Sequence, residues 1–103
     1  MRIRELKVQY VPIPATTGGD RRLTVPREAA QLFAALIGLE ASEVFMIACL
    51  NTKVRLIAVH TVARGSLDTC IVHPREVLKA ALLSNAASII TAHNHPSGIA
   101  VPS

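Results

Sequence analysis

The chain has 103 residues, of which 50% are hydrophobic and 17% are charged, so it has the size and composition of one small folded domain. Two Phe, one Tyr and no Trp imply an aliphatic core and argue against a base-stacking platform for single-stranded nucleic acid. No apolar stretch approaches the roughly 20 residues needed to span a bilayer, so we expect no membrane partner. Cys49 and Cys70 form no CxxC pair, and with no signal peptide they predict a reducing, cytoplasmic location.

Basic residues are concentrated near the start of the chain, whose formal net charge is +4. Six of the eleven lie within the first 27 residues: Arg2, Arg4, Lys7, Arg21, Arg22 and Arg27. Such an arm can contact phosphates or an acidic partner, or it can be a solvated terminus. We favour the solvated terminus, because basic clusters occur often without a binding role.

The first half of the chain predicts a strand, a loop and a helix. Apolar residues alternate loosely over 3–13, which favours a strand, and Gly and Asp content makes 16–20 a loop. A helix should begin at Pro26, with Thr24 as its cap, and end at Gly38. Its buried face follows the i, i+3, i+4 spacing: Ala29, Leu32, Phe33, Leu36 and Ile37.

The second half predicts a hairpin, a helix and a final strand. Residues 44–50 are continuously apolar, as in a strand buried on both faces, and 54–62 form the second strand of the hairpin. Residues 67–72 are too short to assign, a helix covers 73–85, and 87–92 form a strand. The helix should bury one stripe: Val77, Leu78, Ala81 and Leu82. This order predicts an α/β domain with a mixed sheet flanked by helices.

Two histidines follow the final strand directly. His93 and His95 stand at i and i+2, so both imidazoles point to the same face of a strand, and Pro96 ends that strand. Their nitrogens can converge on one zinc ion at about 2.0–2.1 Å. His-x-His alone is also an ordinary polar end of a strand, so the spacing does not decide between the two interpretations.

The wider sequence resembles a known family. The string HNHPSG at 93–98 resembles the signature of the RadC family, within the JAB/MPN zinc metallohydrolase superfamily. The superfamily motif is an upstream Glu, then His-x-His, seven residues, Ser, two residues and Asp. Its first four positions fall here on Glu43, His93, His95 and Ser103. The resemblance covers 23–103, with supporting matches at 42–45, 50–53 and 71–77, and leaves 1–22 as an N-terminal strand and basic segment.

This resemblance implies a JAB/MPN-like (cytidine-deaminase-like) fold and zinc-dependent hydrolysis of a peptide or isopeptide bond in a peptide or protein substrate. His93 and His95 would bind Zn²⁺, Glu43 would exchange protons, and Ser103 would donate a hydrogen bond to the oxyanion. The sequence ends three residues before the position of the motif's Asp. We therefore expect a metal site and a fold incomplete at the C-terminus, with weakened zinc binding and an uncovered strand edge that favours self-association.

An alternative function is a non-catalytic module that associates with DNA or with another protein. RadC members are commonly labelled DNA repair proteins, and the basic arm is compatible with phosphate contacts. No helix-turn-helix or aromatic nucleic-acid motif supports it, so we rank this function second. We interpret the other notable residues as structural, with His60 on a strand, His73 at a helix start and Cys49 in the core.

Overall fold

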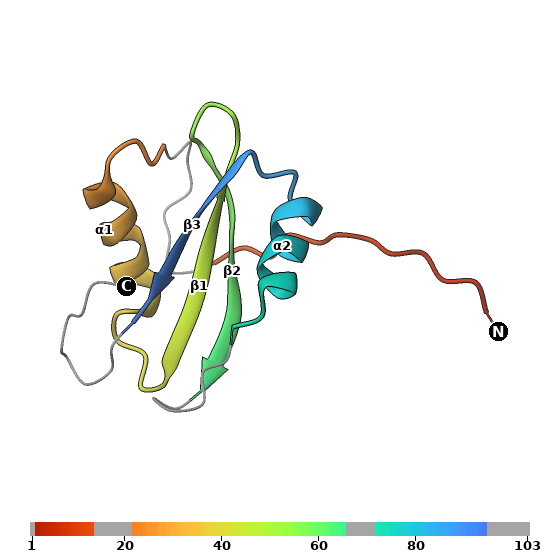
Figure 1. Ribbon diagram of the computed structural model, residues 1–103, viewed down its shortest axis with the longest axis horizontal. Helices are drawn as coiled ribbons and strands as arrows, with labels where there is room; N and C mark the ends of the chain where they lie inside the picture. Colours follow the sequence, from red (N-terminus) through yellow and green to blue (C-terminus); the bar gives the residue numbers. More distant parts are fainter. Residues whose placement is uncertain (1, 14–21, 66–71, 95–103) are drawn as a thin grey trace.

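The computed structural model describes residues 2–13, 22–65 and 72–94. Its elements are, in order, α1 (Pro26–Ile37), β1 (Glu43–Leu50), β2 (Leu56–Gly65), α2 (Pro74–Leu83) and β3 (Ser88–His93). The strands form one sheet in the order β2-β1-β3, and Figure 1 shows it between α1 and α2. This confirms the predicted α/β class with helices flanking a sheet, and both strand pairs described are antiparallel. Neither helix of the described ranges is long and apolar enough to cross a membrane.

Strand β1 is the centre of the fold, with β2 on one side and β3 on the other. Alternate residues of a strand point to opposite faces. The face toward α1 belongs to the main apolar cluster: Val44, Met46, Ala48 and Leu50. Ile47 and Cys49 alternate with these residues and are also fully buried. The predicted two-sided burial of this strand is confirmed, and Cys49 is a core residue with a free thiol.

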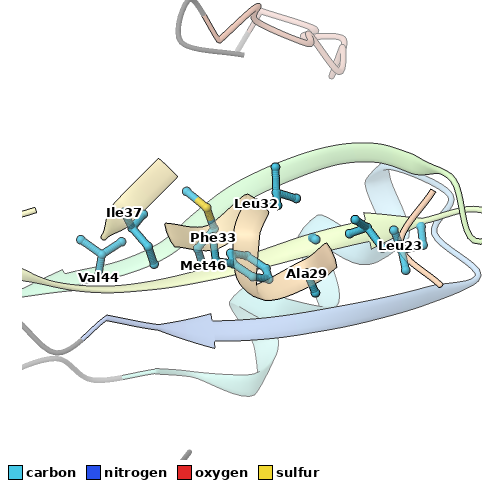
Figure 2. Close-up of a cluster of buried hydrophobic side chains, with 9 residues drawn as sticks. Leu23, Ala29, Leu32, Phe33, Ile37, Val44 and Met46 are labelled. Atoms are coloured by element: carbon cyan, nitrogen blue, oxygen red, sulfur yellow. The ribbon is translucent and has the colours of Figure 1, made fainter. Parts of the chain in front are cut away.

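Helix α1 covers this sheet with the apolar face that its spacing predicts. Ala29, Leu32, Phe33 and Ile37 are buried, and Leu36 is partly buried. Figure 2 shows Ile37 beside Val44 and Phe33 beside Met46 of β1. The packing of α1 therefore anchors the strand whose first residue is Glu43.

Local contacts define both ends of α1. The residue before the helix is Val25 rather than the predicted Thr24, because the Val25 carbonyl accepts from the N–H of Glu28 at 3.1 Å; the Thr24 hydroxyl donates instead to Oε1 of Glu28 at 2.8 Å. The backbone N–H groups of Thr24 and Val25 donate to the same oxygen at 3.2 Å each. The Thr24 hydroxyl is the main cause that lowers the pKa of Glu28 below its ordinary 4.5. At the other end, a Cβ on Gly38 would lie 2.4 Å from the carbonyl oxygen of Ala34.

The turn between β1 and β2 is built around Asn51, within the turn that the sequence predicts. Its Oδ1 accepts from the backbone N–H groups of Lys53 at 2.9 Å and Arg55 at 3.0 Å. Val54 takes φ 61°, a left-handed conformation that is unfavourable for a β-branched residue. Its carbonyl accepts from the N–H of Leu23 at 3.0 Å, which joins the hairpin to the segment before α1.

Helix α2 lies within the predicted range 73–85 but is shorter and faces differently. It runs from Pro74 to Leu83, and Asn85, two residues further on, takes the left-handed conformation at φ 56°. The predicted buried stripe is wrong: Leu78 and Leu82 are 58% and 76% exposed, and Val77 and Ala81 are only half-buried. No residue of α2 is buried, whereas Ser84, directly after the helix, is.

The N-terminal segment does not form the predicted strand. Residues 2–13 have no helix or strand and are exposed throughout, and Figure 1 shows them running past α2. A strand is stable only beside a neighbour that it pairs with, and loose alternation supplies no such neighbour. The loop predicted at 16–20 and the unassigned segment 67–72 lie outside the described residues, except for Val72.

Truncating the core face of α1 should destabilise the domain. Leu32 is 2% exposed, so Leu32→Ala should lower the free energy of unfolding by about 2–5 kcal/mol, measured by urea denaturation. The matched control is Leu82→Ala on α2, where the side chain is 76% exposed and the change should stay within about 0.5 kcal/mol. Equal losses in the two variants would contradict this assignment of the core.

Candidate active site

Antiparallel pairing of β1 with β3 brings two distant polar residues to one end of the sheet. Glu43 is the first residue of β1 and His93 is the last of β3. Phe45 is the pairing partner of His93, so the start of β1 lies beside the end of β3. Glu43 and His93 are 50 residues apart in the sequence and in direct contact in the fold.

The contact joins Nε2 of the His93 imidazole to Oε1 of the Glu43 carboxylate. Glu43 is only 7% exposed, although its place at a strand start would suit a solvated carboxylate. Its other oxygen, Oε2, is buried and has no hydrogen-bond partner among the residues that the structure describes. Buried polar atoms are usually satisfied, and an exception of this kind is typical of a functional site. Oε2 is therefore the atom most suited to accept a proton or a polar group of a ligand.

The ring of Phe45 holds the imidazole of His93 from the side. The two ring centroids are 6.4 Å apart, with the planes inclined at 42°. Aromatic cross-strand pairs of this kind stabilise a sheet and restrict ring rotation. The His93 side chain is 22% exposed, so the ring is oriented by its neighbours while part of it stays accessible.

Asn94 lies directly beyond β3 and is buried, with 9% exposure. Its Oδ1 accepts from the N–H of Val44 at 2.6 Å. Its Nδ2 donates to the carbonyl oxygens of Ser42 at 3.1 Å and Glu40 at 3.4 Å. No sequence pattern singled out Asn94, although an amide directly after an apolar strand can hydrogen-bond to backbone groups that lack a partner on the next strand.

A groove of about 1040 Å³ runs between α1 and β3 and reaches the candidate site. Its walls are largely apolar, with Phe33 and Ala34 from α1 facing Ile90 and Ala92 of β3. His93 and Asn94 line the same groove. His93 and Asn94 therefore lie at the edge of a hollow large enough for several side chains of a bound molecule, while the His93 side chain, opposite Phe45, is on the sheet face that alternates with the α1 side.

Of the four predicted site residues, the structure brings Glu43 and His93 together, whereas His95 and Ser103 lie outside the described residues. Within 2–13, 22–65 and 72–94, no three metal-ligating side chains come together. His60 is exposed on β2, and His73 directly precedes α2. Both positions agree with the structural interpretation of these two histidines.

The described part of the site fits a zinc ion in the chemistry of its donors. Zinc in proteins takes imidazole nitrogen and carboxylate oxygen, and both are present as Nε2 of His93 and the oxygens of Glu43. The same nitrogen can serve a metal or the carboxylate, but not both. Metal binding through Nε2 would therefore replace the contact between His93 and Glu43.

Comparison with known proteins identifies the family. The profile of the RadC-like JAB domain family matches residues 23–103. UPF0758 protein TTE0897 of Caldanaerobacter subterraneus subsp. tengcongensis is 44% identical over 89 residues, which are 86% of this chain and 38% of that protein. UPF0758 proteins of Saccharophagus degradans and Methanosarcina barkeri are 47% and 41% identical, over 79% and 81% of this chain and 36% of each relative. This chain belongs to the RadC-like JAB domain family, and it spans less than half the length of these curated relatives.

Removing one partner of the contact between Glu43 and His93 should lower the free energy of unfolding more than removing both. In protein treated with a chelator, His93→Ala should lower the free energy of unfolding by about 1–3 kcal/mol, because it leaves a buried carboxylate without its partner. In a Glu43→Leu background the same change should cost less, with a coupling of about 0.5–3 kcal/mol. Urea denaturation of the four proteins at pH 7 measures this cycle.

The control for this cycle is His60→Ala, which removes an exposed imidazole from β2 and should change stability by no more than about 0.5 kcal/mol. Strictly additive effects of the Glu43 and His93 changes would contradict the coupling.

Proposed function

We propose that this chain carries part of the active site of a zinc-dependent hydrolase that cleaves a peptide or isopeptide bond. The observation that supports it best is the buried Glu43 carboxylate against the His93 imidazole. These residues stand at the glutamate and first histidine positions of the superfamily motif. A buried acid whose Oε2 has no hydrogen-bond partner within 2–13, 22–65 and 72–94 is unfavourable for the stability of that part of the chain, and a chemical role would account for it.

His93 and His95 are the residues proposed to hold the metal. Their i, i+2 spacing predicts two side chains on one face wherever the extended chain continues past His93, and His95 lies outside the described residues. The motif's third ligand, an Asp, belongs three residues beyond Ser103. When bound, zinc supplies a Lewis acid that polarises the scissile carbonyl and lowers the pKa of water toward about 7.

Glu43 is proposed to move the proton in this reaction. Its Oε2 accepts a proton from the attacking water, and the same carboxyl then delivers that proton to the nitrogen of the leaving amine. The burial of Glu43 keeps bulk water from competing for this oxygen. The Ser103 hydroxyl is proposed to donate a hydrogen bond to the oxygen that becomes negative in the transition state.

Zinc content tests the metal proposal. Elemental analysis of a chain extended past Ser103 should give about one zinc per chain, lost in His93→Ala and in His95→Ala, because each variant removes a ligand. Because the motif's third ligand belongs beyond Ser103, the untagged chain of 103 residues should bind zinc more weakly in the same assay.

His60→Ala is the matched histidine control and should keep its zinc. Glu43→Gln should also keep zinc, but in the extended chain it should hydrolyse a quenched-fluorescent peptide pool about 10²–10⁴-fold more slowly. An extended chain without zinc, or zinc unaffected by either histidine variant, would refute the proposal.

A second candidate function is a non-catalytic module associated with DNA. Arg2, Arg4 and Lys7 are exposed on the N-terminal segment, where Glu5 is the one acidic residue of 2–13. If they contact phosphates, the affinity for duplex DNA should fall steeply with salt, by about 0.9 in log–log slope for each phosphate neutralised. Replacing the three by Ala should flatten that slope in a fluorescence anisotropy titration. No binding at low salt would exclude this function.

A further inference from the structure

We propose that Asn94 is a positioning residue, which holds the Glu43 carboxylate in register with the imidazole of His93. This inference rests on the proposed function, because it assigns to Asn94 the alignment of that site. Asn94 is next to His93 in the sequence, and its side chain reaches across to β1. It contacts the backbone and neither of the two reacting groups, so its effect on them is indirect.

The hydrogen bonds of the Asn94 amide fall on both sides of Glu43. Oδ1 accepts from Val44, the residue after Glu43, at 2.6 Å. Nδ2 donates to Ser42, the residue before it, at 3.1 Å, and to Glu40 at 3.4 Å. One buried amide therefore fixes the backbone on either side of the carboxylate and leaves the Glu43 side chain to face His93.

The amide lies at the end of the described part of the backbone ladder between β1 and β3, since the structure describes the chain only as far as Asn94. The last paired residues are Phe45 and His93, and one backbone hydrogen bond follows, from the N–H of Asn94 to the carbonyl of Val44 at 3.3 Å. Strand ends fray when their backbone groups lose partners. The Asn94 side chain supplies a partner to the N–H of Val44 at that end.

The chemistry of an amide is required for this set of contacts. The site needs one acceptor, toward Val44, and one donor, toward the two carbonyl oxygens. An Asp at position 94 would keep the acceptor but turn an oxygen toward Ser42 and Glu40, where oxygen atoms would repel it. An Ala would provide neither group and would leave buried backbone groups unsatisfied.

The alignment of Glu43 matters because proton transfer depends on short distances. A general base must lie within about 2.6–3.2 Å of its partner, and a displacement of about 1 Å can slow a reaction roughly 10²-fold. Besides the amide, the segment before β1 has an ion pair between Glu40 and Arg64 at 3.1 Å, which is solvent-exposed and therefore weak. On the β2 side Glu43 and Val44 are paired with Gly65 and Arg64, and on the β3 side the buried Asn94 is a stronger constraint than the exposed ion pair.

The test measures whether the coupling between Glu43 and His93 depends on Asn94. The cycle of His93→Ala and Glu43→Leu is repeated in Asn94→Ala and in Asn94→Asp backgrounds, on chelator-treated chain by urea denaturation. We expect the coupling to fall to zero within error in Asn94→Ala. It should also fall in Asn94→Asp, which keeps the acceptor for Val44 and is the variant that decides if Asn94→Ala does not fold.

Leu32→Ala is the matched control, because it destabilises the core away from the site and should leave the coupling at its wild-type size. If Asn94 only stabilised the fold, its variants would leave the coupling between Glu43 and His93 unchanged, as Leu32→Ala should. Wild-type coupling in both Asn94 variants would therefore overturn the proposal. This readout needs neither zinc nor activity. If the coupling is lost while the extended chain neither binds zinc nor hydrolyses peptides, the proposed function fails and the positioning role stands.

Discussion

Antiparallel pairing between β1 and β3 is the constraint on which the rest of the structure depends. It sets Phe45 opposite His93, and this register brings Glu43 into contact with the imidazole. A slip of one residue would turn His93 to the other face of the sheet and separate the pair. The register is secured from a distance, because α1 packs on one face of β1 and makes any slip expose buried side chains such as Val44.

The family and the chemistry of the site lead to the same two residues. Membership in the RadC-like JAB domain family follows from the match over 23–103, and the contact between Glu43 and His93 follows from the strand register. The hydrolase activity is proposed because, in the part of the chain that the structure describes, the buried Oε2 of Glu43 has no hydrogen-bond partner, which works against stability. Proteins keep such arrangements where function requires them and compensate elsewhere, here through the packed core and the Asn94 amide.

Local patterns in the sequence predict much of this fold. Apolar spacing and Pro26 give α1, the turn residues at Asn51 give the hairpin, and the HNHPSG string leads to His93 and, through the family motif, to Glu43. These local patterns do not determine which residues become neighbours in the folded domain. The stripe on α2 could face either way, so Leu82 was predicted buried and is exposed. The role of Asn94 depends on backbone groups about 50 residues away, which no local pattern contains.

The central claim is that Glu43 and the two histidines form one metal-dependent site at the end of the sheet. Crystals of the chain grown with zinc, with anomalous diffraction recorded at the zinc edge, test it most directly. The account predicts one anomalous peak about 2.0–2.1 Å from an imidazole nitrogen of His93 and of His95, with the Glu43 carboxylate beside the ion and no longer in contact with His93. A peak elsewhere, or His93 still held by Glu43 in zinc-saturated crystals, would contradict it.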